Sequence, residues 1–144
     1  MDSGKKFEAL VDKWVADTEK NIMAVIKNSI EDLVDEASVP VKSGGKMPVD
    51  TGFLRLSGTG AVNQMPEGEG RGRNRNLGEI GVIYQSNPTG AIKPMLIKFE
   101  MGDTFYFGWT AIYAPLMNIK YGFLDSAVQN WSDIVANNVR KLKG

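Results

Sequence analysis

The sequence predicts an α+β fold in which helices pack on one face of a small antiparallel sheet. Three features indicate it: a helical repeat of apolar residues near the N-terminus, alternating and aromatic segments in the middle, and a second helical repeat at the end. With 144 residues, the chain has the size of one domain, since single domains usually contain roughly 100–200 residues. We expect one domain over 1–144, with a long helix over 1–38, a linker over 39–52, the sheet over 53–113 and a helical part over 114–144.

The first helix is predicted because apolar residues recur mostly at steps of three, four and seven. They are Phe7, Leu10, Val11, Trp14, Val15, Ile22, Val25, Ile26, Ile30, Leu33, Val34 and Ala37. Ser3 could cap the start, which would leave Gly4 outside the helix body, and Pro40 follows the end. About 30 helical residues span roughly 45 Å, more than a small domain needs. The helix therefore either lies along the sheet, or projects at one end toward another molecule, and the two interpretations can coexist.

Three strands are expected, over Phe53–Val62, Leu77–Gln85 and Phe105–Tyr113, because apolar residues alternate or aromatic residues cluster there. The linker before them contains prolines and glycines without periodicity, which indicates a loop. Residues 66–76 contain no apolar side chain apart from the leading proline. Such a stretch gains too little from burial to become ordered, so we expect a flexible hairpin loop.

Shorter helices complete the fold. Ile92–Met101 is ambiguous, but fits a short helix with Pro94 in its first turn and Gly102 as its C-terminal cap. A second short helix is expected over Ala114–Ile119, and a final helix over Leu124–Leu142. We expect the three tryptophans to pack in the core, although surface aromatic residues could instead anchor an interface: Trp14, Trp109 and Trp131.

The composition excludes several classes of chemistry. The chain has no cysteine and no histidine, which rules out disulfides, thiol nucleophiles and the Ser-His-Asp triad. No apolar run approaches the roughly 18–20 residues that span a bilayer, and no apolar signal core opens the chain, so we expect a cytoplasmic protein without a membrane partner. The net charge is zero, which argues against a dedicated nucleic-acid binder.

The charge is nevertheless unevenly distributed. Residues 1–40 carry 5 basic and 9 acidic side chains, whereas residues 41–76 carry 6 basic and 3 acidic ones. Opposite poles favour head-to-tail association of copies, although such asymmetry is also common without function.

Without histidine and cysteine, catalysis would have to come from carboxylates, lysine, tyrosine, serine or threonine, and a magnesium-dependent nuclease would need two or three carboxylates brought together. The candidates outside the first helix are Asp50, Glu67, Glu69, Glu79, Glu100 and Asp103. A glycine-rich loop holds metal geometry poorly, and Asp50 and Asp103 each precede a threonine, which favours capping or turn roles. We therefore expect no enzyme, no metal and no cofactor.

Three loop arginines, Arg71, Arg73 and Arg75, alternate with glycine and asparagine. An extended chain would put all three on one side, where they could contact a phosphate backbone. They could equally belong to a solvated loop, or become ordered against a neighbouring subunit.

Two segments resemble a family of tail components from long-tailed double-stranded DNA phages, described as neck, head–tail joining or tail-completion proteins. The first is Pro48-Val-Asp-Thr-Gly-Phe-Leu-Arg-Leu-Ser57, and the second is Tyr113-Ala-Pro-Leu-Met-Asn-Ile-Lys-Tyr-Gly122. Flanking pieces are similar too: Gly102-Asp-Thr-Phe-Tyr-Phe-Gly-Trp109, Gly122-Phe123 and Trp131-Ser-Asp-Ile-Val135. The chain departs from the pattern at Lys120, where the family has glutamate, and at Pro115, where it has a basic residue.

The resemblance implies a non-enzymatic virion protein, made in the host bacterial cytoplasm. Copies would form a ring, for which we favour a hexamer. The ring would lie between the head connector or stopper and the tail terminator or tail tube, with DNA passing in its lumen. The residues that the motifs single out are Asp50, Thr51, Gly52, Leu54 and Arg55 in the first turn, and Tyr113, Ala114, Tyr121 and Gly122 in the second corner. Arg55 would lie on a strand, away from the core, as a cross-subunit ion-pair donor or as a plain exposed charge.

Three alternatives stay open. A tail terminator ring protein shares a similar α+β plan. A nucleic-acid-binding module would use the arginine loop, and its affinity would fall steeply with salt. A carboxylate–magnesium nuclease would cut DNA when supplied with that metal.

Overall fold

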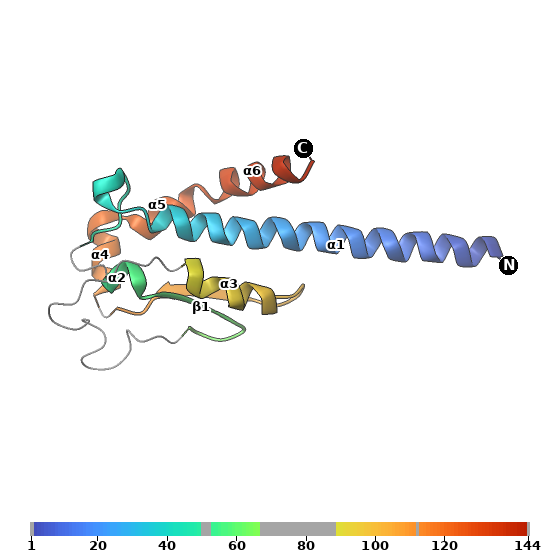
Figure 1. Ribbon diagram of the computed structural model, residues 1–144, viewed down its shortest axis with the longest axis horizontal. Coiled ribbons are helices and arrows are strands. Elements are labelled where there is room, and N and C mark those ends of the chain that lie inside the picture. The colour runs from blue at the N-terminus through green and yellow to red at the C-terminus, as the bar shows by residue number, and fades with distance from the viewer. Residues whose placement is uncertain (1, 50–52, 67–88, 112, 144) are drawn as a thin grey trace.

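The computed structural model describes residues 2–49, 53–66, 89–111 and 113–143. A long helix, α1 (Asp2–Ala37), dominates it, and the other elements gather around the C-terminal half of α1 (Figure 1). Helix α6 (Trp131–Lys143) lies along one side of that half, while the sheet and helix α3 (Thr89–Lys98) lie on the other. The predicted α+β class is confirmed.

Helix α1 has one packed half and one projecting half, and its predicted contact with another molecule stays a prediction. Its C-terminal half is packed, with Val25, Ser29, Val34 and Ala37 buried. Its N-terminal half projects beyond the other described elements (Figure 1). The helix includes Gly4, so the expectation that this glycine lies outside the helix body is wrong.

The described sheet has two antiparallel strands, β1 (Gly58–Val62) and β2 (Phe105–Trp109). Gly58 pairs with Trp109, and Val62 pairs with Phe105. A Cβ atom on Gly60 would lie 2.6 Å from Cζ of the Phe105 ring, so glycine lets this aromatic side chain cover the strand. The predicted strand 77–85 and residues 67–76 of the predicted loop lie outside the described residues.

Both predicted strands in the described part are shorter than expected. The first begins as a helical turn, α2 (Phe53–Leu56), because the Leu54 carbonyl accepts the backbone N–H and the hydroxyl of Ser57. The second ends at Trp109. Beyond it, Thr110 donates to the Ser57 carbonyl and the Ala111 N–H donates to the Ser57 hydroxyl. Thr110 and Ala111 therefore bond to the turn at Ser57 instead of extending the antiparallel pairing of β1 and β2.

Asn63 joins the end of β1 to the start of β2. Its φ of 60° is positive, its side-chain oxygen accepts the Thr104 N–H at 2.9 Å, and its amide donates to Asp103 at 3.0 Å. The Asn63 amide, helped by the Glu100 N–H, lowers the pKa of Asp103. A lowered pKa stabilises the fold above the unfolded value of about 4, and this contribution disappears as the pH falls through the folded value.

We expect Asn63→Ala to lower the free energy of unfolding by about 1–2 kcal/mol, because alanine loses both side-chain bonds and is strained at positive φ. Urea denaturation at neutral pH measures this loss. Asn63→Gly removes the bonds without the strain, so it should cost less, and an NMR titration should show the pKa of Asp103 moving up toward its ordinary value. Stability equal to wild type in both variants would contradict this role.

The remaining helices are α3, α4 (Ala114–Tyr121), α5 (Phe123–Gln129) and α6. Helix α3 ends at Lys98 and includes Pro94 in its interior, so placing this proline in the first turn was wrong. Gly102 does have a positive φ, of 92°. It lies in a turn closed by the Asp103 N–H on the Glu100 carbonyl, beyond the helix that it was predicted to cap.

The predicted final helix 124–142 is wrong as one element, because it divides at Asn130 into α5 and α6. The Asn130 side chain donates to Glu36 at 2.8 Å, which anchors the break to α1. Further along, the buried Asn138 amide donates to Ser29 and Asp32 of α1. Two asparagines therefore set how α6 lies against α1.

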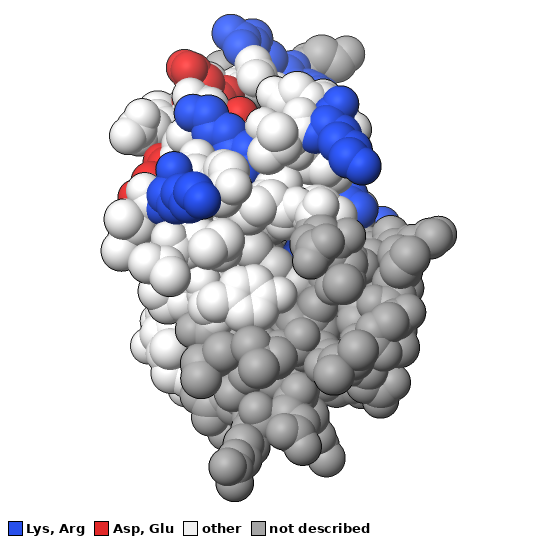
Figure 2. Space-filling model, turned by 90° about the vertical axis from the view of Figure 1, so that its left-hand side faces the viewer, with Lys and Arg blue, Asp and Glu red and all other residues white. Residues whose placement is uncertain are grey.

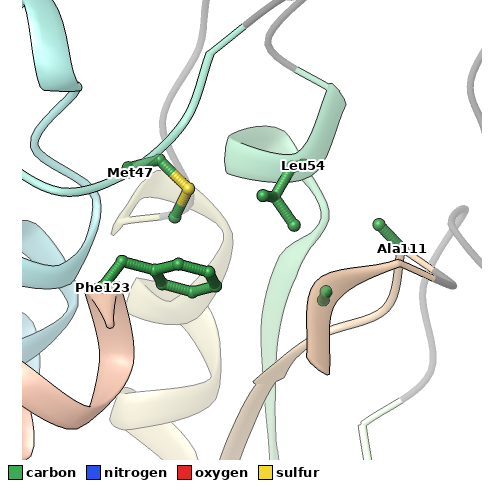
Figure 3. Close-up of a cluster of buried hydrophobic side chains, with 5 residues drawn as sticks. Met47, Leu54, Ala111 and Phe123 are labelled. Atoms are coloured by element: carbon green, nitrogen blue, oxygen red, sulfur yellow. The ribbon is translucent and has the colours of Figure 1, made fainter. Parts of the chain in front are cut away.

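Two clusters of buried side chains hold the elements together. One consists of Val34, Ile92 and Leu96, and joins α1 to α3. The other collects side chains from separate segments (Figure 3): Met47, Leu54, Ala111, Ala114 and Phe123. The rings of Phe107, Trp109 and Phe123 meet edge to face, 4.9 and 5.0 Å apart, which connects the sheet to α5.

Candidate assembly interface

The two sequence motifs meet in the second cluster. Leu54 of the first motif and Ala114 of the second are both buried there, 4% and 6% exposed, and Tyr113 packs against the same cluster. Asp50, Thr51 and Gly52 lie outside the described residues. The part of the first motif that is described thus forms one structural corner with the second, although the two lie about sixty residues apart in the sequence.

Arg55 lies on helix α2 and is half-buried, so its predicted place on a strand is wrong. Its Nε donates to the backbone carbonyl of Ser38, just after α1, at 2.8 Å. This bond fastens the first motif to the end of the long helix, an intrachain role that the sequence pattern did not suggest. A contact of Arg55 with a neighbouring copy stays a prediction.

The second motif turns the chain between α4 and α5. Gly122 has a positive φ of 69°, and its N–H donates to the Asn118 carbonyl at 2.7 Å. The Asn118 side chain accepts the N–H groups of Leu124 and Asp125, which caps α5. Tyr121 is exposed, with the Lys120 ammonium 5.4 Å from its ring centroid. Sequence reasoning missed Asn118, whose type favours such caps.

A tight turn carries the chain from α1 into the motif corner. It contains a 3₁₀ turn, η1 (Val41–Ser43), and a parallel bridge between Pro40 and Met47. A Cβ atom on Gly45 would lie 2.6 Å from the carbonyl carbon of Val39. Only glycine fits this close backbone approach, which delivers Met47 into the buried cluster.

We expect Gly45→Ala to destabilise the protein by about 2 kcal/mol, because the added methyl group forces the backbone of this turn apart. Gly108→Ala is the matched control, since a Cβ at that position meets nothing within 4 Å. Thermal unfolding of both variants measures the difference. Equal effects of the two substitutions would show that the backbone of this turn accommodates the added methyl group at little cost in stability.

One end of the molecule, around η1 and α4, exposes apolar and basic side chains together. Figure 2 shows lysine and arginine side chains spread over the upper part of this end, with uncharged surface and some acidic side chains between them. Exposed apolar residues of these elements are Val41, Leu116 and Ile119, and exposed lysines are Lys42, Lys46 and Lys120.

The projecting half of α1 exposes a second apolar surface. We call it the α1 stripe: Phe7, Leu10, Val11, Trp14, Val15 and Ile22. Phe7, Leu10 and Trp14 are each 67% exposed, and the other three are 40–45% exposed. The core position expected for Trp14 is therefore wrong, whereas Trp109 and Trp131 are partly buried. Helical spacing placed these residues on one face, but the described part of the chain brings no element over it.

The structure describes only some of the candidate catalytic and DNA-binding residues. Arg71, Arg73, Arg75, Asp50, Glu67, Glu69 and Glu79 lie outside the described residues. Asp103 accepts the Glu100 N–H and the Asn63 amide, which confirms its predicted turn role. Within the described ranges, no three acidic side chains gather to hold a metal ion.

An open groove of about 510 Å³ lies between α1 and α6. Its lining combines two acidic residues of α1 with polar and basic residues of α6: Asp32, Glu36, Ile134, Asn137, Arg140 and Lys141. The Arg140 guanidinium donates to the Asn137 side chain. The groove thus has acidic residues on its α1 side and basic residues on its α6 side.

Comparison of the chain with family models, curated proteins and solved structures finds no match. Among the helices of the described residues, none combines the length and apolar character needed to cross a membrane.

Proposed function

We propose that this chain is a structural protein of the neck of a long-tailed double-stranded DNA phage. Copies assemble as a ring between the head connector and the tail tube, and this ring joins a filled head to its tail. We favour a hexamer as the size of the ring. The protein acts by assembly rather than by catalysis, and its place is the virion.

The observation that carries an assembly role is the α1 stripe. Monomeric soluble proteins rarely leave large contiguous apolar surfaces open, and such surfaces mark interaction sites. An isolated helical half this long also gains little stability in water without a packing partner. A projecting, apolar helix is therefore expected of a protein that is completed by its neighbours.

The assignment to a phage neck is supported by the two sequence motifs. Both motifs contribute to one buried corner, through Leu54 and Ala114, so they specify one local structure. The corner adjoins the end of α1 through the Arg55 bond to Ser38. The resemblance thus covers the part of the chain that positions the long helix.

Deletion of the coding sequence from the genome that carries it tests this function. Electron microscopy of the lysate should show DNA-filled heads and separate tails, and the purified protein added to that lysate should join them. Intact particles in the deletion lysate would contradict the proposal. This readout does not depend on which surface forms the ring.

A further inference from the structure

The α1 stripe faces the same way as the surface that α6 covers further along the helix. Phe7 and Val25 are 18 residues apart, which is about five full turns of an α-helix. Val11 stands in the same relation to Ser29, and Ser29 accepts the amide of Asn138 on α6. The stripe is therefore the continuation of a packing face, beyond the point where α6 ends (Figure 1).

The stripe is too wide for a single partner helix. At about 100° per residue, it spans roughly 140° of the helix circumference between Leu10 and Val15. A two-helix seam is narrower, whereas helices with several neighbours have broader apolar faces. Leu10 and Trp14 lie toward one edge of the stripe, and Val15 and Ile22 lie toward the other. Each edge can then serve a different neighbour.

The flanks of the stripe carry opposite charges. Beside the edge that contains Val15 lie Glu8, Asp12 and Glu19, and beside the edge that contains Leu10 lie Lys6, Lys13 and Lys20. All six side chains are exposed. Each acidic residue of one flank lies within one or two positions in the sequence of a lysine on the other flank, so the two sets stand at nearly the same levels along the helix axis. By helical position, Asp2 and Asp17 fall on the basic flank and Lys5 falls on the acidic flank. The division is therefore a majority pattern, with three lysines against two acidic residues on one flank and three acidic residues against one lysine on the other.

The charges on the two flanks determine the orientation in which a neighbouring copy can pack. Side-by-side parallel helices bring the acidic flank of one against the basic flank of the next, while antiparallel helices bring like flanks together. In a ring whose symmetry axis runs along α1, all α1 helices are parallel and every contact is heterologous. A second copy of this chain, in parallel orientation, therefore fits both edges of the stripe.

We propose that the projecting α1 halves of neighbouring copies pack side by side, in parallel, and form the contact that closes the ring. The inference rests on the proposed ring and names its interface. The apolar stripe supplies the buried surface. The acidic and basic flanks fix the orientation and exclude antiparallel pairs.

Charge reversal tests the contact. A basic-flank variant replaces Lys6, Lys13 and Lys20 with glutamate, and an acidic-flank variant replaces Glu8, Asp12 and Glu19 with lysine. Light scattering after size exclusion should show a closed oligomer for the wild type and monomers for each variant alone, with association at least tenfold weaker. Mixing the two variants should restore the oligomer, because acidic and basic helices can then alternate.

A control variant with the same change of charge replaces Lys93, Lys98 and Lys141, which are exposed outside α1, with glutamate. It should assemble like the wild type. An unchanged oligomer in the basic-flank variant would overturn the inference while leaving the ring in place. A monomeric wild type, or a mixture that stays monomeric, would also overturn it. The neck function is judged separately, by the deletion experiment.

Discussion

Phe123→Ala is expected to lower the free energy of unfolding by about 3–5 kcal/mol. Phe123 is 2% exposed, lies at the start of α5, and faces Met47 and Leu54 in the buried cluster (Figure 3). Its ring also meets Trp109 edge to face. Alanine would leave a cavity in the corner where the two motifs join, and a domain of this size has little stability to spare.

Urea denaturation, followed by tryptophan fluorescence and by circular dichroism, measures the loss. Leu116→Ala is the matched control, because Leu116 lies on the adjoining helix α4 but is 62% exposed. The control should change stability by less than about 0.5 kcal/mol. A loss below about 1 kcal/mol for Phe123→Ala would show that the motif corner is not a main core of the fold.

Trp14→Ala is expected to weaken self-association by at least about 30-fold. Buried tryptophans dominate the energetics of many interfaces, and truncating one at a hot spot costs about 2 kcal/mol or more, where each 1.4 kcal/mol is tenfold. Trp14 is the largest side chain of the α1 stripe, and the described chain itself leaves it exposed.

Analytical ultracentrifugation over a range of concentrations measures this weakening. Ile97→Ala is the control, because Ile97 is exposed to a similar degree but lies on α3, away from the stripe. Its removal should leave association through α1 intact. Equal association in wild type and Trp14→Ala would mean that the stripe contacts no copy of the chain.

Much of the fold follows from local patterns. The spacing of apolar residues predicted the end of α1 to within one residue, and aromatic residues marked β2. The turn from Phe53 to Leu56 could not be predicted in this way, because four residues that alternate also fit one helical turn. The hydrogen bonds of Ser57 and the burial of Leu54 decide between the two, and both depend on distant segments.

Periodicity also cannot tell which part of a face is covered. Trp14 and Val25 lie on the same side of α1, yet only Val25 is buried. Helix α6 lies along the C-terminal half of α1 and leaves the projecting half uncovered (Figure 1). The break at Asn130 was missed for a similar reason, since its bond to Glu36 joins residues far apart in the sequence. Single polar residues that organise the candidate site, such as Asn118 and Asn63, gave only the general signal that asparagine favours caps and positive φ.

The central claim, that each projecting α1 half contacts two neighbours, is tested most directly by cross-linking. The chain has no cysteine, so Leu10→Cys and Val15→Cys can be combined in one chain and treated with a short bis-maleimide. Because these positions lie at opposite edges of the stripe, we predict a covalent ladder that extends beyond two copies, and that does not form when the reagent is added to protein already unfolded in urea. Each single variant should stop at two copies. A double variant whose ladder also stops at two copies would contradict the account.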